Sequence, residues 1–219
     1  MAAFLECGPF SARDGEGRVL FESTSLALDS GQFVTLEGAS GSGKSTLLRH
    51  VTALERTTAA ERSLGGASYR EASLPEWRKR VTLIAQDAPM LPGSVRDNLI
   101  FPFAQRAGRS FEFAEAEAAR RMSAVGLESL PFDRDVRTIS GGERHRLALL
   151  RGLLWDPPVL VTDEPLAGLD PDTAARCFEL LERFARRPGR LLLCALHDPD
   201  LNQRADLRLR LAGKRLEVV

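Results

Sequence analysis

The chain has 219 residues, and its 30 lysines and arginines balance 30 aspartates and glutamates, so the formal net charge is zero. This balance argues against a nucleic-acid binder, because recognition of backbone phosphates needs a basic surplus. With 43% hydrophobic and 27% charged residues, the composition is typical of a globular protein. The cysteines Cys7, Cys177 and Cys194 lack metal-ligand spacing and are expected to be reduced thiols.

The apolar segments are too short to suggest a membrane span. The longest apolar run in the second half covers residues 191–196, far below the length that crosses a bilayer. The N-terminal residues 1–10 have neither the charged start nor the long apolar core of a signal peptide. We therefore expect the chain to be soluble by itself, with any membrane role acting through another chain.

Strands and helices are predicted to alternate along most of the chain. Residues 18–21 and 25–28 predict an antiparallel sheet in the N-terminal part. A short strand at 34–37 leads into a glycine-rich loop and a helical pattern at 46–54. Further apolar strands are expected at 81–85, 159–161 and 191–196. Because these runs do not alternate with polar residues, they are typical of parallel strands buried on both faces.

Residues 88–137 interrupt this alternation, since they contain no strong strand signal and one helical pattern at 111–125 that Gly126 closes. A helix is predicted over 172–187, and a terminal hairpin over 207–219. We therefore predict one domain, 1–219, of the α/β class. Its core, with a mostly parallel sheet and an antiparallel β part, covers 1–87 and 138–219, and an inserted helical subdomain covers 88–137.

The loop after the strand at 34–37 matches the phosphate-binding pattern G-x-x-x-x-G-K-[ST]. Its glycines let backbone N–H groups converge on an anion, and the following helix adds its positive N-terminal end. Lysine supplies a charge for the β- and γ-phosphates, and the serine hydroxyl can ligate Mg²⁺. A flexible glycine turn is the structural alternative. The predicted nucleotide contacts of this P-loop NTPase core are Gly38, Ala39, Ser40, Gly41, Ser42, Gly43, Lys44, Ser45 and Thr46.

Two acidic residues follow the apolar strand at 159–161. Asp163 is placed to hold Mg²⁺ beside the phosphate loop, as the acid of a Walker B motif does. Glu164 can orient or deprotonate the attacking water, because a glutamate is normally ionised at neutral pH. By themselves these residues could equally start a turn, but a preceding phosphate loop favours the catalytic interpretation.

The segment Ile139-Ser140-Gly141-Gly142-Glu143-Arg144 discriminates among nucleotide-binding proteins. Ser140 and Glu143 predict a capping box that opens a helix running to about residue 154. Capping does not explain the two glycines, because each costs a helix roughly 1 kcal/mol relative to alanine. Bare N–H groups suit close approach to a second phosphate group, and we expect that group to belong to the nucleotide of a partner subunit.

Taken together, these motifs resemble the ATP-binding subunit of an ABC transporter over essentially the whole chain. The P-loop, Gln86 at a strand end, the signature at 139–143, Walker B and His197 at a strand end follow the family's order and spacing. Ile139 and Glu143 stand where the usual signature has leucine and glutamine. The segment at 167–170 resembles the family's D-loop, with glycine where alanine or serine is more common.

The resemblance implies roles for four further residues. Gln86 would contact Mg²⁺ or the attacking water, and His197 would bond the γ-phosphate and steady the water near Glu164. Asp170 would lie at the subunit interface, although it can also cap the following helix. The adenine normally stacks on an upstream aromatic residue, and Phe10 is the candidate because the sole tyrosine lies downstream.

The resemblance also implies a mechanism and partners. Two copies would close head to tail around two Mg-ATP, each P-loop facing the partner's Ser140, Gly141, Gly142 and Glu143, and hydrolysis would loosen the pair. This homodimer would drive a separate transmembrane permease from the cytoplasmic face of the plasma membrane. Residues 86–102 could form the docking lip, or simply pack on their own helix. Residues 93–102 also resemble a subgroup of metal-export (iron-export) subunits.

Two other classes of function compete with this one. A permease-independent ABC ATPase of repair or translation would usually carry two fused ATPase domains or long insertions, and the neutral charge offers no nucleic-acid patch. A P-loop small-molecule kinase would explain Lys44 and Ser45 but neither the signature glycines nor His197. Co-purification with a membrane protein would separate the transporter interpretation from both.

Overall fold

The computed structural model describes residues 3–55, 57, 60–70, 73–87, 89–104 and 115–219. The chain divides into two compact units. The core unit comprises residues 1–83, 157–164 and 182–219, and the helical unit comprises residues 84–156 and 165–181. The helical unit is larger than the segment 88–137 expected from the sequence, because it also includes the signature helix.

The core unit contains two sheets. The antiparallel sheet has the order β2-β1-β4-β5 and is built from β1 (Leu5–Arg13), β2 (Val19–Leu28), β4 (Glu61–Leu64) and β5 (Ala67–Ser68). The second sheet has the order β10-β9-β3-β8-β7-β6. Its strands are β3 (Phe33–Glu37), β6 (Val81–Ile84), β7 (Val159–Asp163), β8 (Leu191–Ala195), β9 (Leu207–Ala212) and β10 (Arg215–Val218).

The central strands of the second sheet run parallel, as predicted from their apolar runs. Strand β3 pairs in parallel with β8 and β9, and β8 pairs in parallel with β7. Every residue of β7 and β8 is buried, which explains the absence of polar alternation in their sequences. The predicted C-terminal hairpin is confirmed as the antiparallel pair β9 and β10. The mixed α/β fold class therefore follows the prediction.

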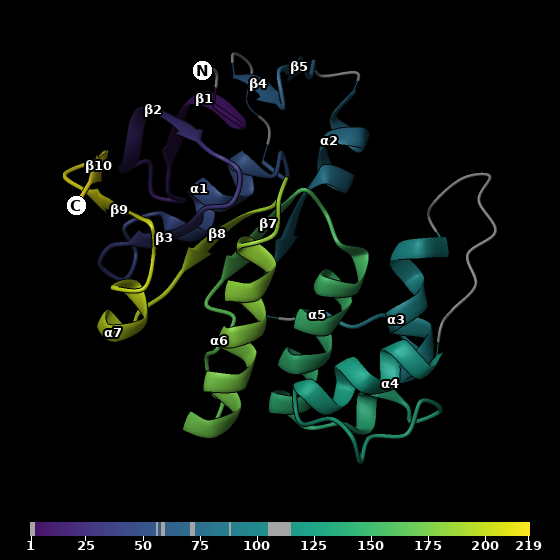
Figure 1. Ribbon diagram of the computed structural model, residues 1–219. Coiled ribbons are helices and arrows are strands. Elements are labelled where there is room, and N and C mark those ends of the chain that lie inside the picture. The colour runs from purple at the N-terminus through teal and green to yellow at the C-terminus, as the bar shows by residue number, and fades with distance from the viewer. Residues whose placement is uncertain (1–2, 56, 58–59, 71–72, 88, 105–114) are drawn as a thin grey trace. The chain divides into compact units, whose positions relative to one another are not determined.

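Helix α1 (Lys44–Val51), labelled in Figure 1, contributes buried side chains to the same core as both sheets. Its apolar residues Leu47, Leu48 and Val51 are buried together with side chains of β1, β2, β3 and β7. Helices α2 (Leu74–Arg80) and α7 (Pro199–Asn202) complete the core unit. The sequence did not predict β1, α2, α7 or the β4–β5 hairpin, and the pieces expected at 18–21 and 25–28 both fall on the single strand β2.

The helical unit contains α3 (Val95–Ala104), α4 (Glu115–Ala124), the 3₁₀ turn η2 (Val136–Thr138) and α5 (Gly141–Trp155). Helix α6 (Pro171–Ala185) belongs to this unit through residue 181. The predicted helix at 111–125 corresponds to α4, and its first four positions lie outside the described residues. Gly126, with φ of 70°, follows the end of α4 as expected.

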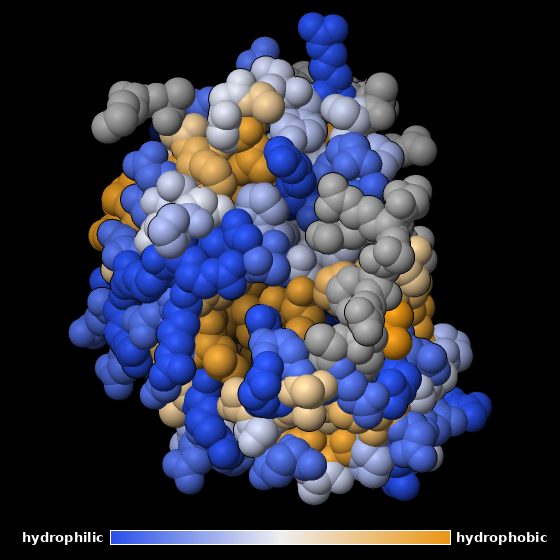
Figure 2. All heavy atoms as spheres, turned by 45° about the vertical axis from the view of Figure 1, so that its right-hand side comes forward, coloured by the Kyte–Doolittle hydropathy of each residue, from blue (hydrophilic) through white to orange (hydrophobic). Residues whose placement is uncertain are grey.

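The described residues contain no helix that is both long and apolar enough to cross a bilayer. Hydrophilic residues cover most of the face drawn in Figure 2, and apolar residues appear in smaller groups between them. Among the large apolar side chains that are exposed, Leu54 and Phe101 belong to the core unit and the helical unit respectively.

Candidate active site

The glycine-rich loop connects β3 to α1 and adopts backbone conformations that require glycine. Gly38 has φ of 155° and Gly43 has φ of 102°. A Cβ at Gly38 would lie 2.8 Å from the carbonyl oxygen of Leu211, and one at Gly43 would lie 3.1 Å from Leu20 Cβ. Side chains at these positions would therefore clash or strain the loop. The spacing of glycines read from the sequence is thus imposed by the path of the backbone.

Lys44 folds back over this loop. Its ammonium donates to the carbonyl oxygens of Gly38, at 2.8 Å, and Ala39, at 3.3 Å, and the residue is 6% exposed. Gly43 caps α1 without a side-chain hydrogen bond, so the first N–H groups of the helix lack a capping side chain. A buried cation beside open helix N–H groups is an anion-binding arrangement.

Three neighbouring parallel strands end level with one another at this loop. Leu36 of β3 pairs with Ala195 of β8, which pairs with Asp163 of β7. The phosphate loop, His197 and Glu164 follow these three positions in the chain. Because ligands bind at the carboxyl ends of strands in such sheets, this edge is the natural site for chemistry.

Glu164 and His197 interact directly at this edge. His197 Nε2 lies 2.6 Å from Glu164 Oε1, and the Glu164 backbone N–H donates to the carbonyl of Ala195. Glu164 has φ of 50°, a left-handed conformation that non-glycine residues rarely adopt. The contact to β8 holds the glutamate in this conformation, so its carboxylate and the imidazole form one unit. Strain of this kind is often found at functional residues.

Asp163 lies one residue earlier and is 7% exposed. Its Oδ1 atom is buried and has no hydrogen-bond partner among the described residues. A buried carboxylate oxygen without a donor is costly unless a cation or water satisfies it. Ser45 is exposed in the first turn of α1. A carboxylate and a hydroxyl are oxygen ligands of the kind that Mg²⁺ prefers, so the residues present fit this ion.

The signature residues begin α5 in the helical unit. Ser140 Oγ accepts from the Glu143 N–H at 3.2 Å, and Glu143 Oε2 accepts from the Ser140 N–H at 2.7 Å. The predicted capping box is therefore confirmed. A Cβ at Gly141 would meet nothing within 4 Å, and one at Gly142 would be 3.9 Å from Leu169. Packing within the described chain therefore does not require glycine at either position.

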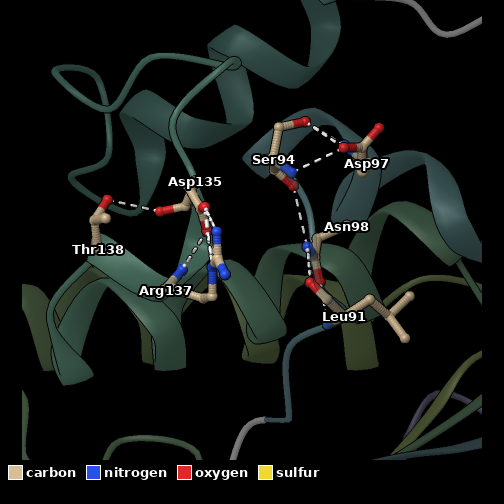
Figure 3. A network of polar contacts seen from close by, with 7 residues as sticks. All are labelled: Leu91, Ser94, Asp97, Asn98, Asp135, Arg137 and Thr138. Atoms are coloured by element: carbon tan, nitrogen blue, oxygen red, sulfur yellow. Dashed lines mark hydrogen bonds and ion pairs between the residues drawn. The ribbon is translucent and has the colours of Figure 1, made fainter.

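A short polar turn leads into the signature (Figure 3). Asp135 Oδ1 accepts from the Arg137 N–H at 2.9 Å, and Thr138 Oγ1 donates to the Asp135 carbonyl at 2.7 Å. Hydrogen bonds from Arg137 lower the pKa of Asp135 to about 2. The turn is joined to the start of α3 by a bridge between Ser94 and Asp135. This turn therefore fixes the direction from which the chain enters α5.

Gln86 and Asp170 also lie in the helical unit. Gln86 is exposed just after β6, and its carbonyl oxygen lies 2.8 Å from Nε2 of His145 on α5. His145 was not among the predicted site residues, although it lies only two residues after Glu143. Asp170 Oδ1 accepts from the Thr173 N–H at 3.0 Å, which is the capping role weighed above. This backbone bond lowers the pKa of Asp170.

Phe10 lies inside the core, away from any ligand surface. It is fully buried, and its ring stacks on His50 with centroids 5.5 Å apart. The guanidinium of Arg62 lies 5.5 Å from the same ring. The prediction that Phe10 stacks on adenine is therefore corrected, because the ring is already packed between core side chains. The register of strand β1 shifts between Cys7 and Phe10, and a position upstream of the glycine-rich loop does not tell which face of the strand Phe10 occupies.

The fold and the candidate site are those of a nucleoside triphosphatase with a glycine-rich loop, acidic residues at a strand end and a glycine-containing signature segment. Residues 21–167 match the model of the ABC transporter family. The chain belongs to this family, as an ATP-hydrolysing subunit. Relatives include a phosphonates import ATP-binding protein of Hyphomonas neptunium, 34% identical over 84% of this chain and 74% of its own. A lipoprotein-releasing system ATP-binding protein of Bordetella pertussis is 35% identical over 93% of this chain and 90% of its own.

Solved structures show the same fold. The ATP-binding cassette MJ0796, in a dimeric structure bound to ADP and Pi, is 22% identical, with a TM-score of 0.85 over 97% of this chain and 96% of its own. A CbiO1 protein of Clostridium perfringens gives a TM-score of 0.78 at 21% identity, over 99% of this chain and 88% of its own. The resemblance to metal-export subunits is not supported, because the relatives named above serve phosphonate import and lipoprotein release.

Proposed function

We propose that the protein works as a head-to-tail pair that closes around two Mg-ATP. The support is that one chain carries two anion-binding surfaces on different units. Lys44 and the glycine loop belong to the core unit, and Ser140 with the glycines that follow it belongs to the helical unit. In a symmetric pair, each copy gives its glycine loop to one nucleotide site and its signature to the other. Both nucleotide sites are then complete. The MJ0796 cassette has been solved as a dimer.

The hydrogen bond between Glu164 and His197 carries the catalytic part of the proposal. At the ends of adjacent strands, the carboxylate can accept a proton from the attacking water while the imidazole fixes its orientation. The same N–H of His197 can instead donate to the γ-phosphate when it is not bonded to Glu164. The backbone N–H of Glu164 is held by the Ala195 carbonyl of β8, so the glutamate needs little reorganisation when substrate binds.

Asp163, Ser45 and Gln86 are the residues proposed to hold Mg²⁺. When bound, the ion neutralises charge that develops on the phosphate oxygens. The buried and unpartnered oxygen of Asp163 supports this assignment, because the chain itself offers it no donor among the described residues. Lys44 adds its positive charge on the phosphate side, and the N-terminus of α1 supplies N–H groups.

Closure of the pair requires contacts between the two copies that form when ATP is bound and are lost after hydrolysis. The signature N–H groups would bond the γ-phosphate across the pair, and its release would remove that stabilisation. We propose that this cycle drives a separate membrane permease, with the protein bound at the cytoplasmic face of the membrane. The relatives' names, which describe ATP-binding components of import and release systems, support this division of labour.

Replacement of Glu164 by Gln tests the proposal. The variant is expected to bind ATP with wild-type affinity and to hydrolyse it at least about 100-fold more slowly, because general-base catalysis contributes at this level. The γ-phosphate then persists, so size-exclusion chromatography with ATP and Mg²⁺ should show a dimer. An undiminished rate of ATP hydrolysis would contradict the proposal that Glu164 accepts the proton of the attacking water.

Ser140→Arg provides the companion test at the other surface. Arginine at this exposed position fills the space that the bare N–H groups need, without touching the P-loop. We expect single-chain nucleotide binding to remain and ATP-dependent pairing to disappear in the Glu164→Gln background. Normal pairing of the double variant would contradict the head-to-tail arrangement while leaving the assignment of Glu164 intact.

A further inference from the structure

His145 holds the backbone of Gln86. Its Nε2 atom lies 2.8 Å from the Gln86 carbonyl oxygen, and because a carbonyl can only accept, Nε2 carries the proton. His145 is on α5, in the second turn of the helix whose first turn contains the signature glycines. The bond therefore ties the residue after β6 to the signature helix within the helical unit.

The residues that follow Gln86 are held by the same helix and by α3. Arg151 of α5 donates to the Pro89 carbonyl at 2.9 Å and to Asn98 Oδ1 at 3.2 Å. The buried side chain of Asn98 accepts from the Leu91 N–H and donates to the Leu91 carbonyl, as Figure 3 shows. The described positions between 86 and 91 thus have three polar anchors on α3 and α5.

We propose that His145 is a positioning residue for ATP hydrolysis, which sets the Gln86 side chain according to the position of the signature helix. This inference rests on the proposed function, in which Gln86 contacts Mg²⁺ or water. His145 makes the first of the three anchors and the one at Gln86 itself. Without it, the Gln86 carbonyl loses its bond to α5, while Arg151 and Asn98 still hold residues 89 and 91.

Steady-state hydrolysis by the full-length protein tests this role. We expect His145→Ala to lower kcat about fivefold, which is the effect of one hydrogen bond, and to leave KM for ATP unchanged. The phosphate loop lies in the other unit and keeps its own contacts. His145→Gln is the matched control, because its amide N–H can donate to the same carbonyl and should restore most of the rate.

A double-mutant cycle with Gln86→Ala separates positioning from a general effect on folding. If His145 acts through Gln86, then adding His145→Ala to Gln86→Ala should change kcat by less than about 1.5-fold. Full additivity of the two losses would overturn the inference and leave the role of Gln86 intact. An unchanged kcat in Gln86→Ala alone would instead overturn the proposed role of Gln86, and the inference with it.

Discussion

At the scale of single residues, Glu143 is the position where this chain departs most informatively from the usual signature. Its carboxylate completes the capping box by accepting from the Ser140 N–H. That backbone bond lowers the pKa of Glu143, so the side chain is ionised at neutral pH and well below it. A negative charge therefore stands at the helix end that we propose faces a triphosphate. It stabilises α5 and opposes the approach of the partner's nucleotide.

Glu143→Gln is therefore expected to strengthen ATP-driven pairing. The amide oxygen of glutamine can still accept from Ser140, while one like charge is removed, worth about 1 kcal/mol in water at contact range. Sedimentation in the Glu164→Gln background should show a dimer dissociation constant about fivefold lower, with the gain shrinking as salt rises. Glu128→Gln, which neutralises another exposed carboxylate of the helical unit, is the control. Equal gains in both variants would contradict a local effect.

The sequence pattern of the glycine-rich loop agrees with its backbone, because Gly38 and Gly43 adopt conformations that side chains would strain, whereas the roles of the loop and of the strand-end acids stay predictions. The prediction for Phe10, in contrast, is wrong. An aromatic residue upstream of the loop has the right chemistry, but that position does not tell which face of β1 it occupies. The bond from His145 to Gln86 was likewise missed, because it joins positions 59 residues apart in the sequence.

At the scale of elements, α1 is held at its C-terminal end by side chains from outside the helix. Arg62 donates to the His50 carbonyl, Trp77 Nε1 donates to the Val51 carbonyl at 2.9 Å, and Arg78 donates to the Ala53 carbonyl. Two of these donors are cations placed near the negative end of the helix dipole. The helix whose N-terminus we propose to face phosphate is thus anchored at its opposite end.

Trp77→Phe is expected to lower the free energy of unfolding by about 2 kcal/mol, because it removes buried volume and leaves the Val51 carbonyl without its donor. Trp77 is fully buried, so water cannot replace the bond. Urea denaturation monitored by circular dichroism measures the loss. Arg78→Leu, at an exposed position, should cost less than half as much. A smaller loss in Trp77→Phe than in Arg78→Leu would refute this account of the anchor.

The elements that the sequence predicted are those with a simple pattern. Strands β7 and β8 are buried on both faces and read as continuous apolar runs. Helix α3 escaped prediction because apolar residues occupy consecutive positions from 99 to 103, interrupted by Pro102, and give no helical period. Asn98, which is polar in sequence, is a core residue of this unit through its bonds to Leu91. Helix α3 and the burial of Asn98 therefore depend on tertiary contacts that the sequence pattern does not reveal.

At the scale of the whole molecule, the order of motifs along the chain predicted the fold class and the family, but not how the motifs divide between units. The phosphate loop, Asp163, Glu164 and His197 belong to the core unit. Gln86, the signature and Asp170 belong to the helical unit. Along the chain, the site residues of the core unit alternate with those of the helical unit, because the core unit is assembled from three separate segments. In the proposed mechanism, binding of nucleotide by one chain and closure of a pair thus involve different units.

This division predicts where nucleotide protects backbone amides from hydrogen exchange. In Glu164→Gln with ATP and Mg²⁺, exchange should slow about tenfold or more both at residues 38–45 and at residues 140–143, because the pair covers both surfaces. With Ser140→Arg added, protection at 38–45 should remain and protection at 140–143 should vanish. ADP serves as a control, since it lacks the γ-phosphate and should protect the phosphate loop without the signature. Protection of the signature by ADP in a monomeric sample would mean that the helical unit senses nucleotide within one chain.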